Sequence, residues 1–246
     1  MLNNKNIIVT GANRGIGKEI LLHAAINSGN IISCARTKSD EHEDYLNSLS
    51  KEYQINTYSY YFDLADYESV KRVSKEIIAE VDKIDGIVNN AGIASGDLFA
   101  MTKIERMKEL FEVNFFAQLN FLHQFIRNMM KHKSGSIINV GSTAGIIGDR
   151  GTTAYGASKA ALMYASKSIA SEVGAFNIRV NNIAPGITKT DMYDQMDEKA
   201  VESALAKVPL KRLAEPSEVA STVIFLLSDF SSYVNGQTIR VDGGSL

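Results

Sequence analysis

Short apolar segments alternate with longer amphipathic segments from one end of the chain to the other. The short segments carry hydrophobic and β-branched residues at consecutive positions, which indicates strands covered on both faces, as in a parallel sheet. The expected strands are Asn6–Thr10, Asn30–Ala35, Thr57–Phe62, Ile84–Asn89, Ser136–Val140, Arg179–Ile183 and Thr238–Val241. The expected helices are Ile16–Ser28, Glu41–Glu52, Tyr67–Val81, Lys103–Lys131, Ala154–Phe176, Glu198–Lys207 and Pro216–Leu227. This alternation predicts a doubly wound parallel sheet of seven strands, with right-handed crossovers and helices on both faces.

No linker, repeat or low-complexity segment interrupts the 246 residues, so we expect one domain over residues 1–246, with a lid over residues 185–212. A formal net charge of −2 argues against a nucleic-acid-binding protein. The single cysteine, Cys34, excludes an internal disulfide and fits a reducing compartment. Neither a signal peptide nor a membrane-length apolar run is recognisable, and the histidines lack metal-ligand spacing. A soluble cytoplasmic protein with no metal, nucleic-acid or membrane partner is therefore expected.

The first expected strand runs into a glycine-containing turn, Thr10–Gly17, and then into a helix. Glycines in such a turn let backbone N–H groups approach an anion, and the N-terminus of the helix adds a favourable dipole. Five residues separate Gly11 from Gly17, one more than in a nucleoside triphosphate loop, and Glu19 stands where that loop needs Ser or Thr. The turn therefore predicts a dinucleotide site in a Rossmann-type fold.

The second expected strand ends in Ala35-Arg36, where an enzyme that uses NAD usually has a carboxylate for the ribose hydroxyls. A carboxylate would repel a 2′-phosphate, whereas Arg36, helped by Arg14, could bind it through charge-assisted hydrogen bonds. The pattern therefore favours NADP.

Tyr155 and Lys159 lie four residues apart, and Ser142 lies thirteen residues before Tyr155. Residues at this spacing share one face of a helix, so an ammonium group can lie beside a phenol and lower its pKa. With a hydroxyl to hold a carbonyl oxygen, the set suits acid–base chemistry on a carbonyl or an alcohol. Taken alone, the pair also fits a solvated helix face.

These features together resemble the short-chain dehydrogenase/reductase family over the whole chain. The matching positions are Thr10–Gly17, Asp63, Asn89-Asn90-Ala91-Gly92, Asn114, Ser142, Tyr155, Lys159 and Pro185-Gly186. The resemblance implies that Tyr155 donates or accepts the proton, that Ser142 orients the carbonyl, and that Lys159 also holds the nicotinamide ribose. It implies that Asn114 holds a water linking Lys159 to solvent; otherwise Asn114 would be a hydrogen-bonded core residue.

The same resemblance implies a cofactor site. Its expected members are Gly11, Asn13, Arg14, Gly15, Ile16, Gly17, Arg36, Asp63, Leu64, Asn90, Ala91, Gly92, Tyr155, Lys159, Pro185, Gly186, Ile187 and Thr188. Asp63 and Leu64 would meet the adenine. Asn90 and Gly92 would meet the ribose and backbone on the adenosine side, and Ile187-Thr188 the carboxamide.

Within the family, the chain resembles bacterial 3-oxoacyl-(acyl-carrier-protein) reductases, for example in Met129-Met130-Lys131, Thr190-Asp191-Met192 and the ending Asp242-Gly243-Gly244. It departs from them at Phe176, where they tend to carry an Arg that meets the acidic carrier, and at Thr152, where they often have Gln. The first expectation is NADPH-dependent reduction of a 3-oxoacyl thioester on an acyl carrier protein. A free sugar, polyol, steroid or small ketone is the alternative substrate, and a non-catalytic NADP-binding regulator is the remote alternative.

The two longest expected helices carry apolar residues beyond a single stripe. These residues include Phe115, Phe116, Leu119, Leu122, Met163 and Tyr164. Such helices need cover on a second face, and the family resemblance implies that a homotetramer of dihedral symmetry supplies it.

Overall fold

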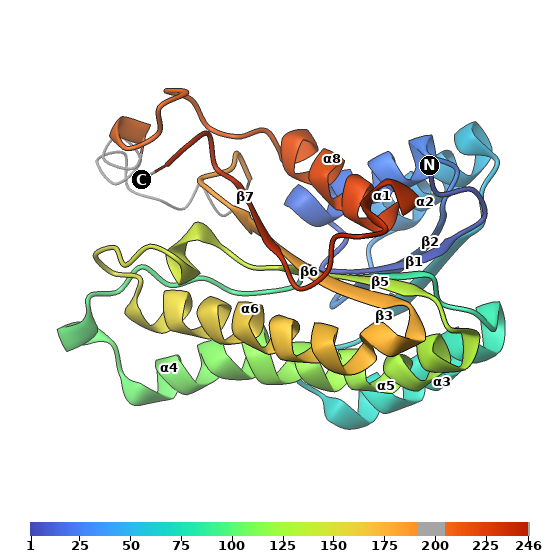
Figure 1. The fold of residues 1–246 in the computed structure, drawn as a ribbon, viewed down its shortest axis with the longest axis horizontal. Helices are drawn as coiled ribbons and strands as arrows, with labels where there is room; N and C mark the ends of the chain where they lie inside the picture. Colours follow the sequence, from blue (N-terminus) through green and yellow to red (C-terminus); the bar gives the residue numbers. More distant parts are fainter. Residues whose placement is uncertain (191–204, 246) are drawn as a thin grey trace.

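The computed structural model describes residues 1–190 and 205–245, which form a parallel sheet between two layers of helices (Figure 1). The strands are β1 (Asn6–Thr10), β2 (Asn30–Ala35), β3 (Thr57–Tyr61), β4 (Gly86–Asn89), β5 (Gly135–Val140), β6 (Ile178–Pro185) and β7 (Thr238–Val241). The helices are α1 (Gly15–Ile26), α2 (Asp40–Tyr53), α3 (Tyr67–Val81), α4 (Ile104–Phe111), α5 (Ala117–His132), α6 (Thr153–Val173) and α8 (Pro216–Leu227).

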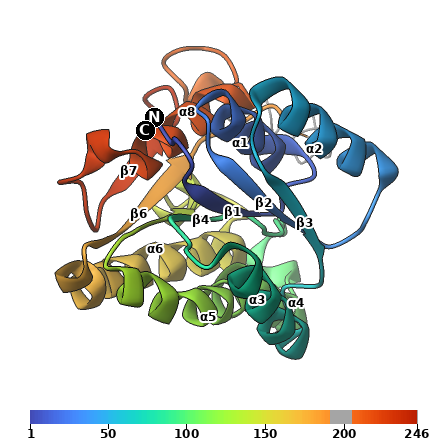
Figure 2. The same ribbon diagram turned by 90° about the vertical axis from the view of Figure 1, so that its right-hand side faces the viewer.

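The strand order is β3-β2-β1-β4-β5-β6-β7, and every neighbouring pair is parallel (Figure 2). The order reverses between β1 and β4, which is the switch point where doubly wound sheets bind their ligands. The expected doubly wound, seven-stranded architecture is therefore confirmed.

Two apolar cores cover the two faces of the sheet because the strand side chains alternate. Ile7 and Val9 pack toward α1 and α8, whereas Ile8 packs toward α3 and α5. Figure 1 shows the corresponding layers, with α1, α2 and α8 on one side and α3, α4, α5 and α6 on the other.

Most expected boundaries agree with the structure to within two residues, and one expected helix is interrupted. The segment expected as one helix over Lys103–Lys131 consists of α4, a π turn at Glu112–Phe116 and α5. The segment expected over Ala154–Phe176 ends in a single 3-10 turn at Gly174–Phe176. Most of the expected helix Glu198–Lys207, and residues 191–204 of the expected lid, lie outside the described residues.

A row of buried polar side chains crosses the middle of the sheet. Asn89, Asn139 and Asn182 are paired in register on β4, β5 and β6, and Thr238 on β7 continues the row. The Asn89 amide donates to Asn139 Oδ1 at 2.7 Å, and the Asn182 amide donates to Thr238 Oγ1 at 3.1 Å. The Asn139 amide donates to Ser166 Oγ on α6 at 2.8 Å, so the row also joins the sheet to that helix.

Candidate active site

The expected cofactor residues lie at the carboxyl edge of the sheet, beginning with the turn between β1 and α1. Gly11 and Gly15 have positive φ angles of 62° and 53°, which side chains rarely adopt. A Cβ on Gly17 would lie 2.2 Å from Gly11 O, so only glycine lets the start of α1 approach the end of β1 this closely. A glycine turn at the N-terminus of a helix is the arrangement that binds a dinucleotide pyrophosphate in doubly wound folds.

The turn after β4 holds the glycine turn in place across the switch point. The Asn90 amide donates to Thr10 O at 3.0 Å and to Gly11 O at 3.1 Å. Thr10 Oγ1 accepts from the backbone N–H groups of Asn90 and Ala91, both at 3.0 Å. Thr10 therefore shapes the site, although it was not among the expected site residues. Its signal in the sequence was its place as the first residue of the Thr10–Gly17 turn.

Three further expected cofactor residues are found at the ends of β1, β2 and β3. Arg14 is the N-cap residue of α1, and Arg36 is exposed directly after β2. Asp63 follows β3 and accepts the Ala65 N–H at 2.9 Å through Oδ1, so one carboxylate oxygen already shapes its loop. Asn13 and Ile16 lie within the same glycine turn and helix start, and Leu64 packs partly against the core.

The segment after β6 completes this edge of the sheet. Gly186 donates its N–H to Val241 O at 3.0 Å, and a Cβ on it would lie 2.8 Å from the Asp242 Cβ. Ile187 O accepts the Ala214 N–H at 3.1 Å, and Thr188 is buried in a parallel bridge with Ala214. The segment that begins at Pro185 is thus held by Val241 on one side and by Ala214 on the other.

Ser142, Tyr155 and Lys159 meet where the end of β5 faces the first turns of α6. Ser142 begins the 3-10 turn Thr143–Gly145, and its Oγ accepts the Ala144 N–H at 3.1 Å. A Cβ on Gly156 would lie 2.3 Å from Ala144 O, so glycine at this position lets the turn pack against the helix. The Ser142 hydroxyl and the Tyr155 phenol are hydrogen-bonded to one another, and Lys159 follows one helical turn after Tyr155 on α6.

The electrostatics of this set differ from the expectation that the ammonium group depresses the phenol pKa. Burial raises the pKa of Tyr155, and its hydrogen bond with the Ser142 side chain acts in the opposite direction. Burial lowers the pKa of Lys159 from 10.5 to about 8, and its Nζ donates to Val140 O at 2.8 Å. In this arrangement desolvation dominates both groups, and a phenol with a raised pKa stays protonated near neutral pH.

Asn114 lies in the π turn, fully buried, with its side chain directed at the turn after β4. Its Oδ1 accepts the Ile93 N–H and its Nδ2 donates to Ile93 O, both at 2.9 Å. The same Nδ2 donates to Ser158 Oγ at 3.1 Å, and Ser158 Oγ in turn donates to Tyr155 O at 2.7 Å. Ser158 thus connects Asn114 to the helix turn that carries Tyr155 and Lys159. Sequence reasoning missed this residue, whose only signal was a small polar residue inside the Tyr155–Lys159 interval.

Gly92 lies against the same group of residues. A Cβ on Gly92 would lie 3.0 Å from Asn114 Oδ1 and 3.2 Å from Lys159 Nζ. A side chain at this position would therefore crowd both groups.

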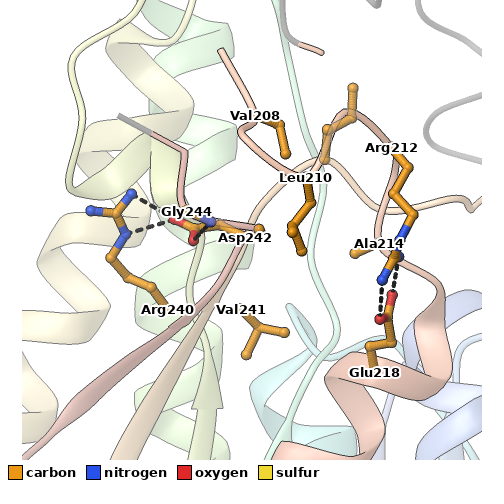
Figure 3. A pocket seen from close by; sticks show the side chains of 11 residues that line it. Val208, Leu210, Arg212, Ala214, Glu218, Arg240, Val241, Asp242 and Gly244 are labelled. Atoms are coloured by element: carbon orange, nitrogen blue, oxygen red, sulfur yellow. Dashed lines mark hydrogen bonds and ion pairs between the residues drawn. The ribbon is translucent and has the colours of Figure 1, made fainter. Parts of the chain in front are cut away.

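A pocket of about 280 Å³ lies apart from the catalytic candidates, between the tail after β7 and residues 208–214 (Figure 3). Arg212 makes two 2.7 Å hydrogen bonds with Glu218, and Arg240 bonds to Asp242 at 2.6 Å. The charged side chains that line this pocket therefore neutralise one another, and none of the four catalytic candidates lines it.

Three further observations concern the cysteine, metal ions and membranes. Cys34 is buried, and burial raises the pKa of its thiol, so it packs as a small apolar residue. Within residues 1–190 and 205–245, no cluster of three or more His, Cys, Asp or Glu could hold a metal ion. Across the same part of the chain, no helix is long and apolar enough to cross a membrane.

The fold and this edge define a doubly wound α/β protein with a glycine turn at the switch point, beside a half-buried hydroxyl and phenol and a buried ammonium group. A family model described as "Enoyl-(Acyl carrier protein) reductase" matches residues 11–245. The chain belongs to the short-chain dehydrogenase/reductase family and is an oxidoreductase of that family.

Individual relatives agree with this assignment. The chain is 38% identical over 246 residues to the 3-oxoacyl-[acyl-carrier-protein] reductase FabG of Thermotoga maritima, covering 99% of this chain and 98% of that one. It is 37% identical to the FabG of Vibrio cholerae, with the same coverage. Among solved structures, levodione reductase superposes with a TM-score of 0.92 at 26% identity, covering 99% of this chain and 98% of that one. YwfH, described as an NADPH-dependent reductase involved in bacilysin biosynthesis, also gives 0.92, at 28% identity and 99% coverage of both chains.

Proposed function

We propose that this chain catalyses the NADPH-dependent reduction of a ketone to a secondary alcohol, with a 3-oxoacyl thioester on an acyl carrier protein as substrate. The observation that carries the proposal is the meeting of Ser142, Tyr155 and Lys159 at the carboxyl edge of the sheet, with Asn114 behind them. The names of the Thermotoga and Vibrio relatives support the thioester substrate.

The roles of the side chains follow from their positions. When bound, the nicotinamide supplies a hydride to the carbonyl carbon. Tyr155, kept protonated by its raised pKa, donates its proton to the carbonyl oxygen, while Ser142 donates a second hydrogen bond to the same oxygen. Lys159 is charged below about pH 8 and stabilises the phenolate that remains after proton transfer. Asn114 holds Ile93 and Ser158 and so fixes the wall behind Lys159.

The preference for NADPH rests on the end of β2. Arg36 is exposed there, and the sequence places no carboxylate at that strand end. A 2′-phosphate next to Arg36 and Arg14 would gain charge-assisted hydrogen bonds. The description of YwfH as NADPH-dependent is consistent with this choice. Arg36→Asp should reverse the preference, and equal affinity of the native protein for NADPH and NADH in a fluorescence titration would refute the proposal.

A small ketone is the second candidate substrate, and levodione reductase among the structural neighbours favours it. Phe176 packs partly against the core next to α6, and Thr152 Oγ1 donates to Asp149 O at 2.7 Å. Phe176 therefore offers no positive charge to an acidic carrier protein. The Thr152 hydroxyl is already bonded within its own turn. Turnover of acetoacetyl thioesters, free and carrier-linked, beside a panel of ketones and sugars distinguishes the two candidates. Reduction of the ketones alone would refute the thioester assignment.

We also propose a homotetramer, because two separate apolar patches are exposed. Phe116 and Tyr164 are 49% and 72% exposed on the α5–α6 side, whereas Leu122 and Met163 are buried within their own chain. Phe230 and Tyr233, near the edge strand β7, are 76% and 103% exposed. Two distinct self-associating patches produce dihedral symmetry. A monomer in light scattering at micromolar concentration would rule the tetramer out.

A further inference from the structure

The π turn at Glu112–Phe116 changes the hydrogen bonding of the long helix at the point where Asn114 turns inward. The Ala117 N–H donates to Glu112 O, five residues back, instead of to Val113 O, four residues back as in an α-helix. Val113 O therefore loses its usual backbone donor. Val113 is half-buried, and a carbonyl shielded from water without a donor is costly, so a side-chain donor stabilises it.

Gln118 supplies the missing donor. Its side chain is fully buried, and its Nε2 donates to Val113 O at 3.2 Å. The same Nε2 donates to Ala91 O at 2.7 Å, in the turn that follows β4. The amide can have only this orientation, because the reverse would direct its oxygen at two carbonyl oxygens. In this orientation Oε1 has no hydrogen-bond partner within the described part of the chain, a cost that the two bonds must offset.

The two carbonyls that Gln118 joins belong to the turn after β4, which approaches the ammonium group of Lys159, and to the π turn, whose Asn114 binds that turn. Ala91 precedes Gly92, where a Cβ would lie 3.2 Å from Lys159 Nζ. Val113 precedes Asn114, whose side chain forms the paired bonds with Ile93. One buried amide thus sets the separation between the turn and the helix that together form the wall behind Lys159.

We propose that Gln118 is a positioning residue for the reaction: its amide fixes the π turn to the turn after β4 and so holds Asn114 and Gly92 against Lys159. The inference rests on the proposed reductase activity, because a positioning role is defined by the reaction it serves. Gln118 reaches neither substrate nor cofactor through these contacts. Its loss should therefore affect turnover more than the KM of the carbonyl substrate.

Gln118→Met tests the role, because methionine has a similar length and no N–H donor. A displacement of about 1 Å in a catalytic group can cost about 100-fold, so we expect kcat to fall by roughly 10- to 100-fold. Looser packing around Lys159 should also admit water and move the basic limb of the pH–rate profile to higher pH.

Asn128→Leu is the matched control. Asn128 is also a buried amide on α5, about 15 Å further along the helix axis, and it binds the Ile84 N–H and Asp82 O. It should lower Tm without changing kcat or the pH profile.

Gln118→Glu provides a second test of almost unchanged shape. The introduced carboxylate repels two carbonyl oxygens when ionised but can donate one hydrogen bond when protonated. Its kcat relative to the native enzyme should therefore recover as the pH falls. Native kcat and a native pH profile in folded Gln118→Met, or a pH-independent ratio for Gln118→Glu, would overturn the proposal.

Hydrogen exchange separates this proposal from the proposed activity. In Gln118→Met, the amides of residues 91–93 and of the π turn should exchange faster, whereas Asn128→Leu should affect only residues near Ile84. This result would support the positioning role even if the native protein reduced no carbonyl in the panel, an outcome that would refute the proposed function. Unchanged exchange at residues 91–93 would refute the positioning role alone.

Discussion

Replacing Lys159 with methionine should make the protein more stable near neutral pH while removing its activity. Lys159 is 4% exposed, and no carboxylate pairs with it within residues 1–190 and 205–245. Lowering its pKa from 10.5 to about 8 corresponds to roughly 3 to 4 kcal/mol, at about 1.4 kcal/mol per pH unit. Removing the hydrogen bond to Val140 O costs about 2 kcal/mol. The net expectation at pH 7 is a gain of about 1 to 2 kcal/mol, or about 2 to 8 °C in Tm.

The dependence on pH is the sharper part of this prediction. The native lysine carries its full desolvation cost below about pH 8, where it is charged in both the folded and the unfolded chain. Between about pH 8 and its ordinary value of 10.5, the folded chain releases the proton first, so the native protein gains stability relative to Lys159→Met. The stability difference should therefore change sign, with the variant less stable by about 2 kcal/mol near pH 10.5.

Urea unfolding from pH 6.5 to 10.5, at fixed protein concentration, measures this difference in the free energy of unfolding. Lys167→Met is the control, because Lys167 is exposed on the same helix and should give a difference that does not vary with pH. A Lys159→Met protein that is less stable than the native protein at every pH, by a constant amount, would refute the reasoning. It would mean that the ammonium group is not desolvated in the folded protein.

Three further predictions concern other parts of the site and fold. Tyr155→Phe should lower kcat by about 100- to 10,000-fold while Tm and NADPH affinity stay near native, and more than about a tenth of native turnover would exclude Tyr155 as the acid. Gly17→Ala places a Cβ 2.2 Å from Gly11 O, so it should abolish NADPH binding in a titration or prevent folding, and native affinity would contradict the packing. Burial lowers the pKa of His42, so its stabilising effect is complete above about pH 6.5 and is lost as the pH falls through the lower folded value. His42→Phe should therefore reduce the loss of Tm between pH 7 and pH 5, and an unchanged loss would assign that pH dependence to other groups.

The sequence predicted the strands and helices whose bounds are set by a local pattern of residues. β1 is a β-branched run bounded by a glycine turn, and α3 begins after the capping residue Asp66; both elements have the expected bounds. The meeting of Ser142 with Tyr155 also followed from the sequence, because the ends of parallel strands and the helix starts beside them share one edge of the sheet.

The π turn, the direction of the Tyr155 pKa and the role of Gln118 depend on tertiary contacts, which no local sequence pattern predicts. The π turn arises from one shifted hydrogen bond, and its only sign in the sequence is a polar residue, Asn114, within an apolar stretch. The direction of the Tyr155 pKa depends on how much water reaches the phenol, which packing alone decides. The role of Gln118 depends on two carbonyls 5 and 27 residues away.

The row of Asn89, Asn139 and Asn182 has a consequence for the accuracy of the whole site. A buried strand of consecutive Ile and Val residues specifies its pairing register only weakly. After a slip of one residue, apolar side chains would still pack against apolar side chains. The same slip would turn an amide to the opposite face and leave buried polar atoms unpaired, at about 1–3 kcal/mol for each group.

Each of these amides lies one to three residues before a site segment: Asn90 follows Asn89, Ser142 follows Asn139, and Pro185 follows Asn182. The alignment of the amides therefore determines how far each strand end projects toward the substrate. A sheet with valine at all three positions would be expected to fold and even to gain stability. Its strands, however, would no longer be held in one register, so their ends would not be aligned at the site. Residues that never contact a substrate thus set the positions of those that do.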